Sequence, residues 1–200
     1  MFEIDAKVLK KDIRKRILSD RERLPADIRA AHSAAITERL MQLPEYRDVA
    51  MVLGYMNFGS EFASDLFAAK VLAEGKRLAL PKVNRHTNQL DLYWVEDFEN
   101  QLAPGLWGIR EPVVERCERL ETLNEVEFAL LPGVAFTCEG ARLGYGGGFY
   151  DKLLADDRGR RPVLVAAAFA LQIVEQLPQE VTDIKVGVIV TERETIACTA

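Results

Sequence analysis

Residues 141–151 have the sequence ARLGYGGGFYD, in which four of the five positions from 144 to 148 are glycine. Glycine has no Cβ, so it adopts positive φ angles and lets a backbone come close to a ligand. The apolar run at residues 128–131, which a Pro-Gly pair ends, predicts a buried strand, and residues 149–154 predict the first turns of a helix. The order strand, glycine-rich loop and helix predicts an α/β protein with a ligand site at the loop.

The residues in and around this loop suit a nucleotide phosphate. Successive backbone N–H groups of such a loop can bind an anion, and the N-terminus of the following helix adds a partial positive charge. Arg142 offers a planar cation to phosphate oxygens, and Asp151 offers an oxygen ligand of the kind that Mg²⁺ prefers. We therefore interpret the loop as a phosphate site in which Gly147, the middle of three glycines, approaches the nucleotide. A merely flexible loop is the alternative, because the sequence matches neither the Walker loop nor the dinucleotide fingerprint.

Helical and strand-like patterns alternate along the rest of the chain. Apolar residues recur at helical spacing in residues 5–24 and again between Pro25 and Pro44, and Ser64 and Asp65 resemble the N-cap of a third helix. Apolar runs predict strands at residues 49–55, 77–80, 90–95, 128–131, 163–168 and 186–190.

This alternation predicts one α/β domain over residues 1–200, with a mostly parallel open sheet flanked by helices on both faces. We expect it to be similar to the ribose-phosphate isomerase and CoA-transferase-like Rossmannoid folds. Residues 96–125 fit no regular pattern, and we expect them to cross irregularly over the ligand cleft. Because ligands of such sheets bind beyond the carboxyl ends of the strands, Glu61 and the glycine-rich loop can face one crevice.

The composition is that of a globular protein and excludes some kinds of partner. The chain of 200 residues is 48% hydrophobic and carries a net charge of −5, which argues against nonspecific nucleic-acid binding. The longest apolar run, at residues 163–171, is far shorter than the roughly 20 residues that a membrane-spanning helix needs. With no signal peptide visible, Cys117, Cys138 and Cys198 indicate reduced thiols in a cytoplasmic protein, which we expect to be a monomer.

Residues 132–154, PGVAFTCEGARLGYGGGFYDKLL, resemble the signature of the 5-formyltetrahydrofolate cyclo-ligases, also called 5,10-methenyltetrahydrofolate synthetases. Further motifs in the same order extend the resemblance over nearly the whole chain: Lys10-Lys-Asp-Ile-Arg14, Arg21-Glu-Arg-Leu24, Tyr55-Met-Asn-Phe-Gly-Ser-Glu61, Trp107-Gly-Ile-Arg-Glu-Pro112, Gln172, Leu177-Pro178 and Asp183. Two positions depart from the pattern, since Thr137 replaces the usual Asp after Ala-Phe and Phe149 replaces the first of two tyrosines. The first departure bears on loop anchoring and metal hydration.

The resemblance implies ATP as co-substrate, Mg²⁺ and a reduced folate as ligands, and it assigns roles to individual residues. Arg142 and Tyr150 would be catalytic, and Asp151 and Asp183 would hold Mg²⁺. The implied ATP contacts are Lys10, Arg14, Arg142, Leu143, Gly144, Tyr145, Gly146, Gly147, Gly148, Phe149 and Tyr150. The implied folate contacts are Met56, Glu61, Tyr145, Gly146, Gly147, Gly148 and Phe149.

Without the resemblance, simpler interpretations stay open for several of these residues. Lys10 and Arg14 are four residues apart and would be two charges on a solvated helix face. Glu61 would be an exposed loop carboxylate, Met56 a core residue and Trp107 either a core anchor or a stacking surface.

The implied reaction is ATP-dependent conversion of 5-formyltetrahydrofolate to 5,10-methenyltetrahydrofolate, with release of ADP and phosphate. The formyl oxygen would attack the γ-phosphate, and nitrogen 10 would then close the ring as phosphate leaves. Two other functions stay open: an isomerase that binds a sugar phosphate at the loop, and a relative that binds folate or nucleotide without turnover. Consumption of ATP coupled to folate conversion separates all three.

Overall fold

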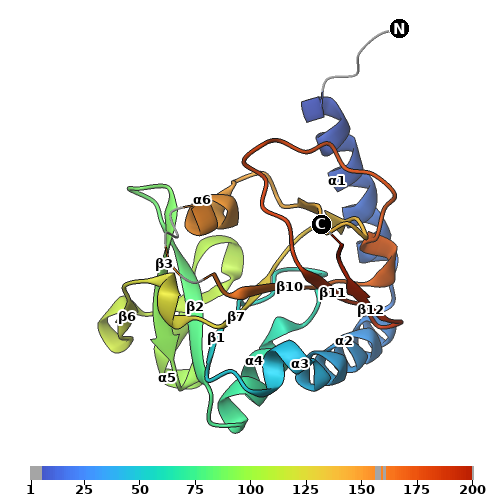
Figure 1. Ribbon diagram of the computed structural model, residues 1–200. Coiled ribbons are helices and arrows are strands. Elements are labelled where there is room, and N and C mark those ends of the chain that lie inside the picture. The colour runs from blue at the N-terminus through green and yellow to red at the C-terminus, as the bar shows by residue number, and fades with distance from the viewer. Residues whose placement is uncertain (1–5, 156–158, 160, 200) are drawn as a thin grey trace, which may run out of the picture.

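An eight-stranded sheet in the order β12-β11-β10-β7-β1-β2-β3-β6 forms the centre of the protein (Figure 1). The computed structural model describes residues 6–155, 159 and 161–199. The strands are β1 (Met51–Leu53), β2 (Arg77–Asn84), β3 (Gln89–Val95), β6 (Arg119–Leu120), β7 (Phe128–Leu131), β10 (Val163–Ala167), β11 (Val188–Val190) and β12 (Thr195–Ala197). The five strands from β11 to β2 are parallel, and β12, β3 and β6 pair antiparallel at the two edges. The predicted mostly parallel α/β sheet is therefore confirmed.

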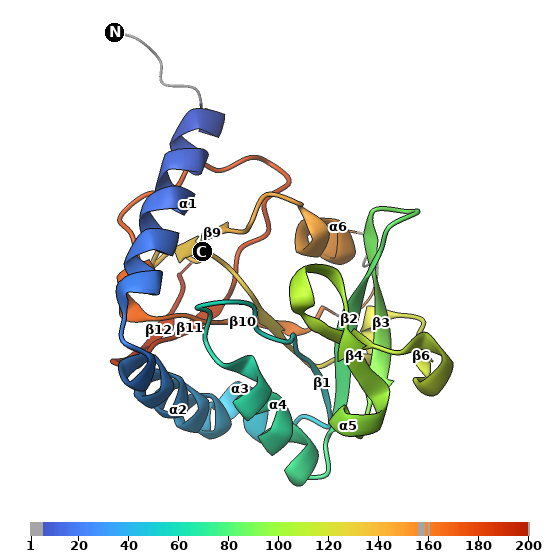
Figure 2. The ribbon, with the colours of Figure 1, turned by 180° about the vertical axis from the view of Figure 1, so that it is seen from behind.

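Alternate residues of each strand point to opposite faces of the sheet, and each face has its own cover. Phe128 and Leu130 of β7 pack against α2 (Ala26–Gln42), α3 (Pro44–Arg47) and α4 (Ser64–Ala73). The next residues along the strand, Ala129 and Leu131, pack on the other side with Leu154 of α6 (Phe149–Ala155). Figures 1 and 2 show α2, α3 and α4 on one side of the sheet and α6 on the other.

Helix α1 (Ala6–Arg23) packs beside the strands that lead into the glycine-rich loop. Ile13 and Ile17 of this helix contact Val134, Ala135 and Leu143, which belong to or adjoin the two-stranded sheet of β8 (Ala135–Phe136) and β9 (Arg142–Leu143). The buried residues of α1 also include Lys10 and Arg21, so its buried face carries two cations. This packing brings α1 to the loop that follows β9.

Buried Gln172 ties the same region to the sheet. Its side-chain amide donates to the carbonyl oxygens of Gly133 and Val134 at 3.0 and 3.1 Å, and its Oε1 accepts from the backbone N–H of Phe169 at 2.9 Å. Gln172, which lies in the short helix η4 (Ala170–Gln172), is only 2% exposed. The residue therefore satisfies three backbone groups that water does not reach.

Some local predictions were wrong. Strand β2 extends to Asn84 rather than to residue 80, because it forms a long antiparallel hairpin with β3 in which Asn84 pairs with Gln89. Ser64 and Asp65 do not cap α4: they are its first two residues, Ala63 is the N-cap, and the Ser64 hydroxyl instead donates to the Tyr55 carbonyl.

Residues 96–125 contain only short elements, as their irregular pattern predicted. These are α5 (Phe98–Gln101), β4 (Leu102–Pro104), η1 (Leu106–Gly108), β5 (Arg110–Pro112), η2 (Val114–Arg116), β6 and η3 (Leu123–Glu125). Strands β4 and β5 form a small separate hairpin. Among the helices of the described ranges, none combines the length and apolar character needed to span a membrane.

Replacement of Gln172 tests its structural role. Gln172→Leu leaves the three backbone groups without this partner, so we expect the free energy of unfolding to fall by about 3 kcal/mol or more. Urea unfolding measures the change, and Gln176→Leu, at an exposed position four residues away, is the matched control. An unchanged unfolding midpoint in Gln172→Leu would contradict this role.

Candidate active site

The glycine-rich loop at residues 144–148 joins β9 to α6 and uses its glycines in two ways. Gly146 and Gly148 have φ angles of 106° and 64°, which residues with a Cβ rarely adopt. Gly147 has no positive φ, but a Cβ there would lie 2.6 Å from Cε2 of Phe149. The ring of Phe149, rather than a left-handed backbone, therefore requires glycine at the middle position.

Two cavities meet at this loop. One, of about 1040 Å³, lies between α1, α6 and residues 180–185, and we name it the cationic cavity. The other, of about 650 Å³, lies between the loop, residues 55–61, the β2–β3 hairpin and residues 107–111, and we name it the apolar cavity. Arg142, Gly144, Gly148 and Asp151 line both. The loop and its two flanking charged residues are thus a wall that the two cavities share.

Hydrophobic and aromatic side chains form most of the apolar cavity. Met56, Phe58, Phe149 and Tyr150 line it, as do Pro81, Val83 and Leu90 of the β2–β3 hairpin and Ile109. Trp107 also lines this cavity and is 65% exposed, so its interpretation as a core anchor was wrong. An exposed ring beside an apolar cavity suits stacking on a flat ligand.

Glu61, at the end of the segment 55–61, lines the apolar cavity and is only 9% exposed. Its Oε1 accepts a hydrogen bond from the Tyr145 hydroxyl at 2.7 Å, and its Oε2 accepts from the backbone N–H of Phe58 at 2.7 Å. Burial raises the pKa of Glu61, and these two hydrogen bonds and the charge of Arg21 lower it by less. Each carboxylate oxygen has a further lone pair for a donor on a ligand.

The tyrosines beside Glu61 stay neutral and can donate hydrogen bonds. Burial and the Glu61 carboxylate raise the pKa of Tyr145 and of Tyr150, although Arg142 partly opposes the shift at Tyr150. A neutral phenol both donates and accepts. The Tyr145 proton is directed at Glu61, so the apolar cavity offers the carboxylate oxygens of Glu61 and the hydroxyl of Tyr150 to the polar edges of a flat ligand.

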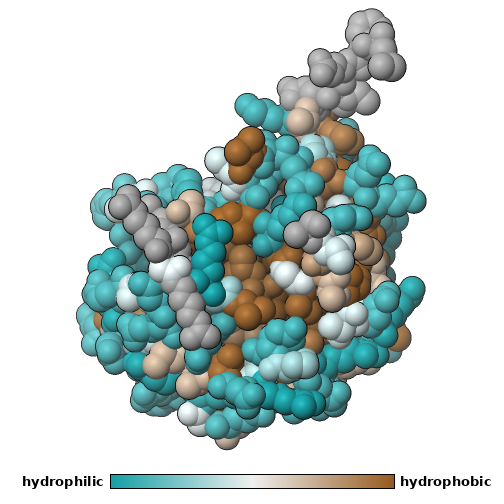
Figure 3. Space-filling model, viewed as in Figure 1, coloured by the Kyte–Doolittle hydropathy of each residue, from teal (hydrophilic) through white to brown (hydrophobic). Residues whose placement is uncertain are grey.

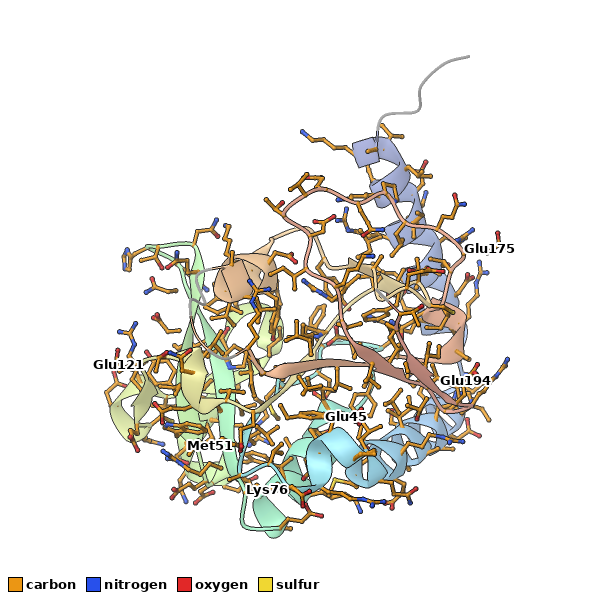
Figure 4. The ribbon with its side chains drawn as sticks, in the orientation of Figure 1. Glu45, Met51, Lys76, Glu121, Glu175 and Glu194 are labelled. Carbon is orange, nitrogen blue, oxygen red and sulfur yellow. The ribbon has the colours of Figure 1, made fainter. Side chains whose placement is uncertain are left out.

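The cationic cavity combines many positive charges with few negative ones. Its cations are Lys7, Lys10, Arg14, Arg142, Lys152, Arg161 and Lys185, and its carboxylates are Asp151, Glu180 and Asp183. Figure 3 shows one face of the molecule, with hydrophobic side chains in its middle and mostly hydrophilic ones around them. Exposed acidic residues such as Glu121, Glu175 and Glu194 lie at the edges of the molecule in Figure 4. The local charge suits an anion despite the net charge of −5.

Lys10 and Arg14 both point toward this cavity, so their interpretation as a solvated helix face was wrong. The Lys10 Nζ lies 3.0 Å from both Glu180 Oε1 and Asp183 Oδ2, and Lys10 is 8% exposed. The Arg14 Nε donates to the Gly144 carbonyl at 2.7 Å. Helix α1 thus contacts the glycine-rich loop directly and holds residues 180–183 across the cavity.

Arg142 and Asp151 form an ion pair across the base of the loop. The Arg142 Nη2 lies 2.7 Å from Asp151 Oδ1, which also accepts from the backbone N–H of Ile184 at 3.2 Å. The Arg142 side chain is 3% exposed, and its Nη1 donates to the Pro132 carbonyl at 3.2 Å. Its Nε is buried and has no acceptor among the described residues. This spare donor fits a site whose ligand brings acceptor oxygens.

The two carboxylates predicted to hold Mg²⁺ line one cavity but stand in separate ion pairs. Asp151 pairs with Arg142, and Asp183 pairs with Lys10. Within the described ranges, no group of three or more His, Cys, Asp or Glu side chains could hold a metal ion. Mg²⁺ commonly uses one or two carboxylates together with substrate phosphates, so two carboxylates beside a cationic cavity fit that pattern.

Sequence reasoning missed parts of both cavities. The hairpin residues of the apolar cavity and the cations Lys152 and Lys185 gave no local signal, because only tertiary packing brings them to the loop. Arg21 lines neither cavity but contacts the loop at Tyr145, and no site role was predicted for it. Its signals were its place in the Arg21–Leu24 motif and its spacing of seven residues from Arg14, which puts both on one helix face. Thr137, the departure from the family pattern, lines neither cavity and lies in the turn between β8 and β9.

The fold and the paired cavities define a class of α/β protein in which two cavities of different chemistry meet at one glycine-rich loop. Within that class, the model of the 5-formyltetrahydrofolate cyclo-ligase family matches residues 6–192. The chain belongs to this family.

Individual relatives agree with this assignment. A solved structure of 5,10-methenyltetrahydrofolate synthetase from Aquifex aeolicus is 36% identical with a TM-score of 0.82, over 96% of this chain and 94% of that one. A 5-formyltetrahydrofolate cyclo-ligase from Haemophilus influenzae is 28% identical over 88% of this chain and 93% of the relative. A probable 5-formyltetrahydrofolate cyclo-ligase from Caenorhabditis elegans is 27% identical over 81% of this chain and 82% of the relative.

Proposed function

We propose that this chain converts 5-formyltetrahydrofolate to 5,10-methenyltetrahydrofolate in folate one-carbon metabolism, with ATP cleaved to ADP and phosphate. Membership of the cyclo-ligase family supports the reaction. The structural observation that carries the proposal is the shared wall of two chemically different cavities at Arg142, Gly144, Gly148 and Asp151. A transfer of a phosphoryl group between two substrates needs such a meeting point.

We assign the folate to the apolar cavity. The pterin ring is flat, and its N–H and amino groups are hydrogen-bond donors that suit the free lone pairs of Glu61. Met56 and Phe149 give the ring apolar walls, and Trp107 offers a stacking surface at an exposed edge of the cavity. Six of the seven predicted substrate contacts line this cavity, and the seventh, Gly146, lines the cationic cavity instead.

We assign the ATP phosphates to the cationic cavity, where Lys10, Arg14 and Arg142 supply positive charge. Asp151 and Asp183 would hold Mg²⁺ together with the phosphates, and the ion would neutralise phosphate charge there. Lys10 is bound to two carboxylates in the described conformation. The arrival of phosphate would give it stronger anionic partners and release Asp183.

The reaction then follows from the placement of the two substrates. The formyl oxygen attacks the γ-phosphorus, ADP leaves, and the formyl carbon becomes part of a phosphorylated imidate. Nitrogen 10 attacks that carbon, and phosphate leaves as the five-membered ring closes. Arg142, between the cavities, stabilises the negative charge on the transferred group, and the neutral Tyr150 hydroxyl can donate to one of its oxygens.

No protein nucleophile is needed in this scheme, so the chain acts by position, charge and exclusion of water. A sugar-phosphate isomerase, the main alternative from the sequence, would use the cationic cavity but leave the apolar cavity without a role. We further propose a monomeric cytoplasmic enzyme, and the free thiols of Cys117, Cys138 and Cys198 support the compartment.

The reaction itself is the first test. With 5-formyltetrahydrofolate, ATP and Mg²⁺ together, we expect the absorbance of the methenyl product to rise, with one ADP formed per product. Omission of any one component should stop the reaction, because each takes part in activation of the formyl oxygen. Product formation at an undiminished rate without ATP would rule out the proposed function.

A matched pair of glycine variants tests which cavity holds which substrate. Gly146 lines the cationic cavity and has a φ of 106°, whereas Gly147 lines the apolar cavity against the Phe149 ring. Gly146→Ala strains the loop by about 1–3 kcal/mol and should weaken ATP binding more than folate binding. Gly147→Ala displaces Phe149 and should weaken folate binding more than ATP binding, so we revise the prediction that Gly147 approaches the nucleotide. Calorimetry with each substrate measures both, and equal losses in the two variants would contradict the assignment.

Replacement of Asp151 by asparagine tests the metal role. We expect turnover to fall and the Mg²⁺ concentration for half-maximal rate to rise, because one charged ligand is lost. The change also leaves buried Arg142 without its anionic partner, so the free energy of unfolding should fall by about 1–3 kcal/mol. If turnover falls with no change in the Mg²⁺ dependence, Asp151 anchors Arg142 and binds no metal.

A further inference from the structure

Arg21 is a buried cation without a direct ion pair among the described residues. It is 2% exposed, and its charge lies at the end of α1 where that helix meets two loops. The Nε donates to Ser60 Oγ at 3.0 Å, and the Nη2 donates to the Tyr145 hydroxyl at 2.7 Å. Buried charges are normally paired, so the nearest compensating charge is of interest.

That compensating charge is Glu61, reached through Tyr145. The Tyr145 hydroxyl lies 2.7 Å from both Arg21 Nη2 and Glu61 Oε1. A guanidinium has donors and no acceptor, so the phenol accepts from Arg21 and its own proton points to Glu61. The cation thereby sets the direction of the hydrogen bond that the carboxylate receives.

We propose that Arg21 is a positioning residue that keeps Glu61 ionised and correctly oriented for the pterin, acting through Tyr145 and Ser60. The inference rests on the proposed function for the identity of the ligand and adds a role for a residue outside the site predicted from the sequence. Ser60 directly precedes Glu61. Arg21 therefore holds the segment that carries the carboxylate in two ways: directly at Ser60, and through Tyr145 at Glu61.

Arg21 is the cation whose charge acts on Glu61. The neighbouring titratable groups are Arg21 from α1, Tyr145 from the glycine-rich loop, Tyr55 after β1 and Tyr150 from α6. Other charged residues that line the same cavity are Arg110, Glu111, Arg142 and Asp151. Burial raises the pKa of all three tyrosines, so they stay neutral. Burial also raises the pKa of Glu61 and favours its protonated form, whereas the charge of Arg21 opposes this. Loss of Arg21 therefore moves the pKa of Glu61 further upward.

The direction of the pH effect follows from the chemistry of the ligand. The pterin brings donors, so it needs the carboxylate form of Glu61, which is lost as the pH falls through the pKa of this group. Folate affinity should therefore start to fall at a higher pH in Arg21→Met than in the wild type as the solution is made more acidic. At neutral pH we expect Arg21→Met to bind folate about tenfold to a hundredfold more weakly than the wild type. This fold-change corresponds to the usual free energy of a hydrogen bond to a charged group.

Two measurements on the full chain test the proposal. The first is an NMR titration of the Glu61 carboxyl carbon without ligand in the wild type, Arg21→Met, Arg21→Lys and Tyr145→Phe. We expect a higher pKa in Arg21→Met and in Tyr145→Phe, and a partial return in Arg21→Lys. Arg23→Met, at a 77% exposed arginine of the same helix, should titrate as the wild type does. An unchanged Glu61 titration in a folded Arg21→Met protein would overturn the proposal.

The second measurement is a double-mutant cycle on folate affinity. If Arg21 acts through Glu61, Arg21→Met should cost little further affinity in a Glu61→Gln background. An equal cost in both backgrounds would show a merely structural role and would overturn the proposal. The titration needs no folate, so a wild-type protein that binds no folate would contradict the proposed function while the effect of Arg21 on Glu61 is still measured.

Discussion

The ion pair between Arg142 and Asp151 is the contact on which the site depends, because its two residues stand at the two ends of the glycine-rich loop. The two side chains meet at 2.7 Å, so the loop leaves and returns to one region of the structure. Within it, Gly146 and Gly148 have positive φ angles, and the Phe149 ring leaves no room for a Cβ at Gly147. The buried guanidinium also reaches the Pro132 carbonyl, so the pair links the end of β7 to the start of α6.

Helix α1 completes this arrangement from the other side. Arg14 holds the loop at the Gly144 carbonyl, and Arg21 holds it at the Tyr145 hydroxyl. Lys10, further along the same face, holds residues 180–183. One helix face thus contacts the parts of the chain that enclose both cavities. A cation at each of these positions lets the same helix supply positive charge to the cationic cavity and restrain the carboxylate of the apolar one.

In the proposed function, the loop lets two substrates meet in one small protein. The apolar cavity suits the flat pterin ring, and the cationic cavity suits the ATP phosphates. Two glycines, Gly144 and Gly148, belong to the wall between the cavities. Other acidic residues, such as Glu175 and Glu194 at the edge of the molecule in Figure 4, line neither cavity.

The sequence by itself determined the features that depend on neighbouring residues. The glycines of the loop, the helical spacing of Ile13 and Ile17 and the apolar run of β7 each express a local conformational preference, and the elements they predicted are present. Tertiary structure decided the rest: the hairpin that lengthens β2, the Phe149 ring that constrains Gly147, and the link from Arg21 through Tyr145 to Glu61. Such contacts join residues far apart in the chain. Their formation depends on how α1 and the sheet pack together, which no local pattern of residues specifies.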